Sequence, residues 1–165
     1  MKRFTAMLVL ICMLLSGCSL FGERILEPVT FYYLEADYQY GREGSVFVSE
    51  QREASGHRND LSYLMALYLM GPSDEAHVSP LPRGTRIFRL ENTGKTVSME
   101  LSQHARSLTD AQFSVACACL SMTCLELTTA DQVSISDGER TVNIGRENLT
   151  LHDDSKAIST KEETQ

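Results

Sequence analysis

Three closely spaced cysteines are the residues of this sequence with the most distinctive chemistry: Cys117, Cys119 and Cys124. On a helix, Cys117 and Cys119 point about 200° apart, and Cys117 and Cys124 lie about 10 Å apart along the axis. No pair of the three therefore meets the separation of roughly 4.4–6.8 Å between Cα atoms that a disulfide needs. The spacing also fits poorly with zinc sites, which commonly use C-x₂₋₄-C. We expect two small core residues and one lateral thiol, with Cys119 free or available for an intermolecular bond.

The histidines and the acidic pairs predict no catalytic site. The histidines stand in predicted loops or near the ends of elements, without H-E-x-x-H spacing: His57, His77, His104 and His152. G-x-S-x-G, P-loop and G-x-G-x-x-G motifs are missing from the sequence. The acidic pairs at 74–75 and 153–154 are typical of a solvated surface. We therefore predict no catalytic residue, no cofactor, no metal site, and a protein that is not an enzyme.

The cysteines fall in the second of two predicted helices. Thr109 and Gln112 form a capping-box pattern at its start. At about 100° per residue, one core-facing line then collects Phe113, Ala116, Cys117, Leu120, Cys124 and Leu127. The first helix begins at Asn59 or Asp60 and ends at Gly71-Pro72. Its apolar stripe is Leu61, Leu64, Met65 and Tyr68.

Strand patterns surround the two helices. They cover residues 29–34, 45–50, 85–90, 95–101, 132–136 and 140–144, with turns at 38–44, 92–94 and Asp137-Gly138. Leu149 and Leu151 suggest a last short strand. Aromatic residues gather near the first strands, as core packing or as a protein contact: Phe31, Tyr32, Tyr33, Tyr38 and Tyr40.

The start of the chain resembles a bacterial lipoprotein signal. Lys2 and Arg3 precede an apolar run over residues 4–15 that is too short to span a bilayer, which takes roughly 20 residues. Residues 15–18 read Leu-Ser-Gly-Cys and resemble a lipobox, in which the cysteine, here Cys18, carries a diacylglyceryl group after cleavage. Two acyl chains hold a protein stably at a membrane. We expect a lipid anchor at the extracytoplasmic face of the cell membrane; the alternative is a plain cleaved signal with a chance cysteine.

Length and charge indicate one acidic domain. The chain has 165 residues and a formal net charge of −7, which argues against nucleic-acid binding. We expect a signal peptide over residues 1–17, a lipid-anchored tether over 18–28, one domain over 29–151 and a flexible tail over 152–165.

Four motifs, taken in order, resemble the GerMN domain. A leucine-rich helix closes on Gly71-Pro72, and residues 82–85 match a Pro-x-Gly-Thr turn. A strand over residues 96–102 precedes the second helix, and residues 131–138 resemble the closing V-x-I-x-x-D-G hairpin. The resemblance covers residues 29–145. It implies an α+β fold of ring-building-motif type, in which two helices pack on one face of a small mixed sheet.

The resemblance also implies a link to GerM-like spore germination and sporulation proteins, some of whose relatives assemble into rings in the envelope. This chain departs from them in having room for one copy of the domain rather than two, and in its cysteine-rich second helix. We predict a lipoprotein whose GerMN-like domain acts as a protein–protein interaction or assembly module, through envelope proteins or self-association. The alternative is a small extracytoplasmic module that binds a peptide or a glycan.

Overall fold

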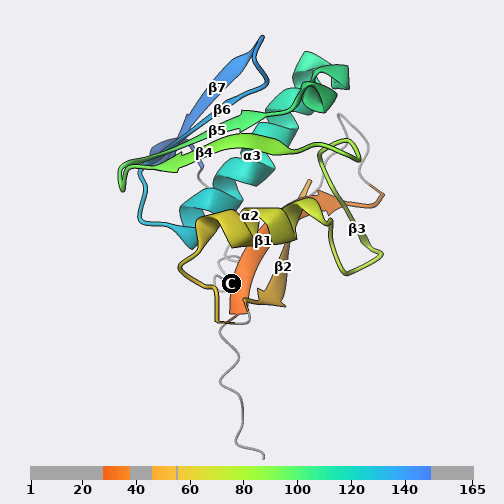
Figure 1. Ribbon diagram of the computed structural model, residues 1–165. Helices are drawn as coiled ribbons and strands as arrows, with labels where there is room; N and C mark the ends of the chain where they lie inside the picture. The colour runs from red at the N-terminus through yellow and green to blue at the C-terminus, as the bar shows by residue number, and fades with distance from the viewer. Residues whose placement is uncertain (1–27, 38–45, 55, 150–165) are drawn as a thin grey trace, which may run out of the picture.

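The computed structural model describes residues 28–37, 46–54 and 56–149. Within these residues, seven strands form two sheets, and two α-helices pack against them (Figure 1). The predicted signal peptide, Cys18, the tether up to residue 27, the turn at 38–44 and the tail at 152–165 lie outside the described residues.

The smaller sheet is antiparallel and has the strand order β2-β1-β3. It consists of β1 (Pro28–Glu35), β2 (Phe47–Glu53) and β3 (His77–Val78). Burial alternates along β1, where the buried side chains are Val29, Phe31 and Tyr33. Because successive side chains of a strand point to opposite faces, one face of this sheet covers the core.

The larger sheet is mixed and has the strand order β4-β5-β6-β7. Its strands are β4 (Ile87–Asn92), β5 (Thr96–Leu101), β6 (Gln132–Ser136) and β7 (Thr141–Gly145). The two outer pairs are antiparallel hairpins, whereas β5 and β6 run parallel. A parallel pair needs a long crossover, and here the crossover consists of η2 (Gln103–Ser107) and helix α3 (Asp110–Leu127).

Both helices begin at the predicted caps. The Asp60 carboxylate accepts the Tyr63 N–H at the start of α2 (Leu61–Leu69), and Gly71 follows its end with φ +90°. Thr109 and Gln112 form the predicted capping box at the start of α3. The local helix signals of the sequence are therefore confirmed.

The predicted core-facing line of α3 is buried from Phe113 to Cys124, but the expectation of Cys119 as a lateral thiol is wrong. Helix α3 contacts β1 of one sheet and β6 and β7 of the other, so it lies between the two sheets (Figure 1). A helix covered from two sides is buried nearly all round. Cys119 is 0% exposed, like Cys117 and Cys124. It is thus not available for a bond to another chain.

The aromatic residues of the first strand form part of the core. The rings of Tyr33 and Tyr68 stack with centroids 4.8 Å apart, and Phe31 meets both edge-on. The Tyr68 hydroxyl donates to the carbonyl of Tyr32, which joins α2 to β1. Core packing is therefore confirmed for Phe31 and Tyr33, while Tyr38 and Tyr40 lie outside the described residues.

The α+β class is confirmed, with the strands divided between two small sheets rather than gathered in one. The strand expected at Leu149 is wrong, because residues 146–148 form a short 3₁₀ helix, η3 (Arg146–Asn148); Leu151 lies outside the described residues. No helix in the described part of the chain has both the length and the apolar character needed to cross a membrane.

Candidate interaction surface

Three large hydrophobic side chains are exposed in the described part of the chain, and two of them line the same hollow. They are Met70, Val78 and Phe88, which are 79%, 45% and 69% exposed. Met70 follows the end of α2, Val78 ends β3, and Phe88 lies in β4. Each of them borders a hollow on the surface.

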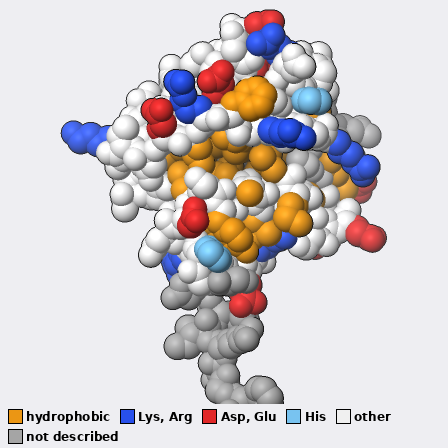
Figure 2. All heavy atoms as spheres, viewed as in Figure 1, with side chains coloured by type: hydrophobic (Ala, Val, Ile, Leu, Met, Phe, Trp, Pro, Cys, Tyr) orange, Lys and Arg blue, Asp and Glu red, His pale blue; other side chains and the backbone are white. Residues whose placement is uncertain are grey.

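The central hollow lies between α2 and β4 and is called here the α2–β4 groove. It has a volume of about 430 Å³, and its lining is Ser62, Met65, Ala66 and Leu69 of α2, together with Arg86, Ile87, Phe88 and Leu90. The α2 residues recur at three- and four-residue spacing, so they form one stripe of the helix. Figure 2 shows hydrophobic side chains gathered in the middle of this face.

Two further hollows adjoin the groove. One, of about 580 Å³, lies toward η2, shares Arg86 and Phe88 with the groove, and is also lined by Glu100 and His104. The other, of about 510 Å³, shares Leu69 and is bordered by Met70 and Val78. The three hollows therefore adjoin one another along α2 and β4, and apolar and polar groups share their lining.

Strand β4 forms one edge of the larger sheet. Its pairing with β5 is regular except at Phe88, where the register shifts between Ile87 and Arg89. Such a bulge displaces one residue from the alternation of the strand. This displacement accounts for the exposure of a large aromatic side chain in the strand.

Arginines without strong partners lie in the groove and in the hollow that adjoins it. Among the described residues, the side chains of Arg83 and Arg86 have no ion pair or hydrogen bond, and both residues are exposed. Arg89 lies 3.8 Å from Glu91, but both side chains are more than half exposed. A pair so exposed contributes little. The rim therefore offers positive charge on a chain whose net charge is −7.

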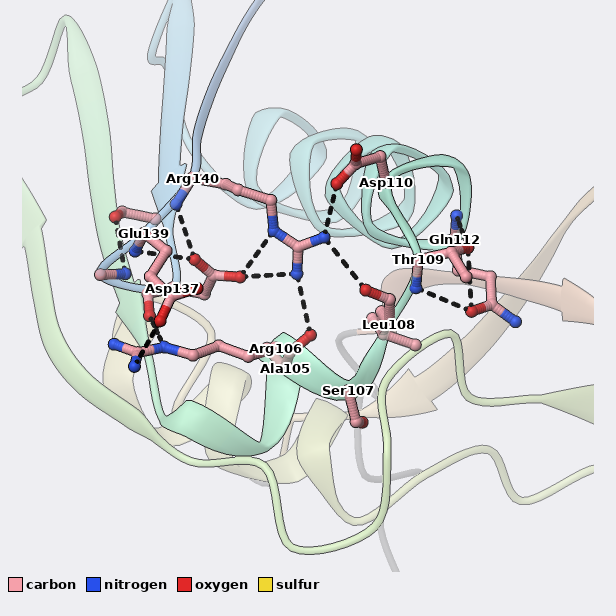
Figure 3. A network of polar contacts seen from close by, with 12 residues as sticks. Ala105, Arg106, Ser107, Leu108, Thr109, Asp110, Gln112, Asp137, Glu139 and Arg140 are labelled. Atoms are coloured by element: carbon pink, nitrogen blue, oxygen red, sulfur yellow. Dashed lines mark hydrogen bonds and ion pairs between the residues drawn. The ribbon is translucent and has the colours of Figure 1, made fainter.

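A buried ion pair holds the elements beside the hollow near η2. Arg140 donates from Nη2 and Nε to Asp137 Oδ2 at 2.7 and 3.0 Å, and from Nη1 to Asp110 Oδ1 at 3.0 Å. The same guanidinium donates to the carbonyls of Leu108 and Ala105 (Figure 3). The β6–β7 turn, η2 and the start of α3 are thus joined through one side chain.

The Asp137 carboxylate is fully enclosed by donors. Its side chain is 0% exposed, and Oδ1 accepts the N–H groups of Glu139 and Arg140 at 3.0 and 2.8 Å. Burial by itself raises the pKa of this carboxyl, but the bonds from Arg140 and Glu139 outweigh burial and lower it below its ordinary value. We therefore assign Asp137 a structural role. The sequence marked it as a turn residue, and its i, i+3 spacing to Arg140 was the signal for the ion pair.

A second buried carboxylate holds the loop after α2. Glu50 accepts the N–H groups of Ser73 and Asp74 and lies 3.2 Å from Nδ1 of His77. Although burial raises the pKa of Glu50, these hydrogen bonds together lower it. The contact with His77 connects β3 to β2, although β1 is the strand that pairs with β3.

The cysteines are enclosed and unreactive in this arrangement. Burial raises the pKa of each of the three thiols to about 12. Cys124 Sγ lies 3.8 Å from Met65 Sδ, which places the sulfur in the contact between the two helices. Within residues 28–37, 46–54 and 56–149, no cluster of three or more metal-ligating side chains occurs.

The histidines lie apart from one another. His57 stacks on Tyr63, His77 contacts Glu50, and His152 is outside the described residues. His104 Nδ1 lies 3.4 Å from Ser102 Oγ, but that hydroxyl belongs to a buried residue and accepts the Arg86 N–H. This contact fits a structural role better than a nucleophile and its base, which need access to a substrate.

No family model matches this chain, and no curated protein matches it either. Solved structures are similar in fold. One is a protein from Clostridium perfringens that is described as a lipoprotein, with a TM-score of 0.46 and 13% identity over 73% of this chain and 89% of that one. Another contains the tandem GerMN domains of the sporulation protein GerM from Bacillus subtilis, with a TM-score of 0.49 and 16% identity over 67% of this chain. This chain covers 39% of that GerM chain.

Proposed function

We propose that this chain is a membrane-tethered extracytoplasmic module that binds other proteins through the apolar surface along α2 and β4. The observation that supports this most strongly is the position of Met70, Val78 and Phe88 around joined hollows. Single exposed hydrophobic residues are common, whereas a continuous apolar patch with a polar rim is typical of a contact site. The proposed function involves no chemical step.

The proposed tether is the lipid on Cys18. A diacylglyceryl group has two chains, and two chains give stable membrane binding where one is marginal. The tether expected from the sequence, over residues 18–28, is short. Such a tether restricts the partners to envelope proteins or to neighbouring copies of the same chain.

Crosslinking in live cells tests this function. The full chain, carrying a C-terminal tag, is crosslinked and purified beside the Cys18→Ala variant. We expect envelope proteins, or untagged copies of this chain, to be captured only when Cys18 is present. A clean preparation without any partner in either form would overturn the proposal.

A ligand-binding role is the second candidate, because the hollow near η2 combines an aromatic face with polar side chains. Phe88 lies there beside Arg86, Gln103 and His104. Aromatic and polar groups that converge on one hollow suit a glycan or a peptide. The chain is titrated with peptidoglycan fragments, and the NMR chemical shifts of these residues are monitored. Changes in these shifts distinguish ligand binding from protein binding.

A further inference from the structure

We propose that the α2–β4 groove binds an extended peptide segment of a partner protein, which adds a strand to β4 and alternates apolar with acidic side chains. This inference rests on the proposed interaction function and specifies the chemistry of the partner. Three features of the molecule support it: the free edge of β4, the stripe of α2 that lines the groove, and the charge of Arg86.

The outer edge of β4 offers backbone groups to another strand. No strand in the described part of the chain pairs with this edge. The Thr93 N–H donates to the Thr96 carbonyl at 3.0 Å, and hydrogen-bonded pairs alternate along an antiparallel ladder. Glu91 therefore bonds to β5, whereas the N–H and C=O groups of Leu90 and Asn92 point toward the free edge. Extended peptides bind at such edges by main-chain hydrogen bonds.

The floor beside this edge is apolar and has room for side chains. Leu90 pairs across the sheet with the buried Met99, so its side chain lies on the inner face, toward α2. On the α2 side, the groove is lined by Ala66, which is small and exposed, and by Leu69. Figure 1 shows α2 running alongside β4, and Figure 2 shows the apolar side chains between them. Every second side chain of an added strand would cover this floor.

The other face of the added strand would meet arginine. Arg89 lies on the outer face of the sheet, opposite Glu100 and 3.8 Å from Glu91, so acidic groups already stand beside it, whereas Arg86 precedes the bulge and lines the groove. Arg86 has no side-chain partner among the described residues. Since opposite charges on neighbouring strands attract, carboxylates of the peptide complement Arg86, which lines the groove.

The bulge at Phe88 limits where a partner strand can pair. Bulges and charged side chains protect sheet edges against indiscriminate association. Regular pairing is left to Arg89–Asn92, and Phe88 stands at one end of that stretch. This geometry favours a short segment with a defined register over open-ended strand addition.

A binding experiment with a simple probe tests the proposal. The full chain is placed in zwitterionic lipid nanodiscs and titrated against a short fluorescein-labelled peptide of alternating valine and aspartate. We expect saturable binding by fluorescence anisotropy. The same peptide with N-methyl groups on alternate amides, which cannot donate to β4, is expected to bind at least about tenfold more weakly, the change that corresponds to roughly 1.4 kcal/mol.

Matched variants locate the binding site. Ala66→Arg fills the groove from an exposed helix position and is expected to abolish binding. Ser114→Arg, at an exposed position of α3, is the control and is expected to leave binding unchanged. Arg86→Glu is expected to weaken binding of the aspartate peptide and to permit binding of a valine–lysine peptide.

Several results would overturn the proposal: an N-methylated peptide that binds as well as the unmodified one, Ala66→Arg without effect, or a wild-type chain that does not bind the peptide. The last result is also expected if a second copy or the lipid surface covers the groove, and light scattering identifies a second copy. If the chain fails to bind the peptide and its live-cell crosslinks persist in the Ala66→Arg variant, proteins bind at another surface, and the assignment of the surface along α2 and β4 is lost as well. If Ala66→Arg removes the crosslinks, the proposed function stands and only the peptide-binding mode is lost.

Discussion

Arg140 donates two side-chain hydrogen bonds to the carboxylate of Asp137, at 2.7 and 3.0 Å, while its Cζ atom lies 4.2 Å from the centre of the Phe113 ring. A guanidinium suits this position because it is planar, always charged and able to donate in several directions. The pair connects the β6–β7 turn to the start of α3. Loss of this pair is therefore expected to destabilise both the larger sheet and helix α3.

Removing the charge of Asp137 is expected to destabilise the protein strongly. Asp137→Asn leaves Arg140, which is 26% exposed, without its main counterion, and removal of one partner from a buried pair costs about 3 kcal/mol. Urea unfolding measures this cost. Glu139→Gln is the matched control, because this exposed partner of Arg106 lies in the same turn and is expected to contribute less than about 1 kcal/mol. Equal effects of the two variants would contradict the assignment.

Acid is expected to weaken the fold through Glu50 and Asp137. The pKa of each carboxyl is lowered in the folded state from its ordinary value, 4.5 for Glu50 and 3.8 for Asp137. A lowered pKa contributes stability that is complete above the unfolded value and is lost as the pH falls through the folded one. The free energy of unfolding, measured by urea titration, is thus expected to be steady near neutral pH and to fall below about pH 4.5. A flat profile down to pH 3 would argue against both networks.

The three core thiols are expected to resist modification in the folded protein. Burial raises their pKa to about 12, so almost no thiolate forms at pH 8. Mass spectrometry after a brief pulse of iodoacetamide is expected to find Cys117, Cys119 and Cys124 unmodified, and fully alkylated once urea is present. Fast labelling of Cys119 alone would contradict its burial and support the lateral position predicted from the helix pattern.

A single hydroxyl joins α3 to the first strand. Thr123 Oγ1 accepts the Tyr32 N–H at 3.0 Å, across 91 positions of sequence. Thr123→Val keeps the shape of the side chain but leaves that N–H without its partner, which costs about 1–3 kcal/mol. The expected signature is lower stability together with faster hydrogen exchange of the Tyr32 amide. Unchanged exchange at this amide would show that the bond is dispensable.

Local signals in the sequence predicted the local structure well. The capping box at Thr109, the Asp60 cap and the turn at Asp137-Gly138 depend on residues within a few positions of one another. Both caps occur as expected, and the turn occurs as a connection over residues 137–140 rather than a two-residue hairpin, because Ser136 pairs with Thr141. The burial of Cys119 depends instead on β1, a strand about 90 residues earlier in the chain. A pattern within one helix does not contain that information.

The candidate surface could not be predicted from the sequence either, for a related reason. The exposure of Phe88 results from a bulge in the pairing of β4 with β5, and the groove exists because α2 lies beside the free edge of β4. Both are relations between separate segments. The strand pattern at residues 85–90 predicted strand β4, but it predicted neither the position of β4 at the edge of the sheet nor its location beside α2.

Site-specific photo-crosslinking in live cells tests the interaction function most directly. A photoreactive amino acid replaces Phe88 in the full chain, and in a second strain it replaces Asn143, an exposed residue of β7 at the opposite edge of the same sheet. We expect a discrete adduct of higher mass from position 88 and none from position 143. No adduct from position 88, or equal adducts from both positions, would contradict the assignment of the α2–β4 face as the binding surface.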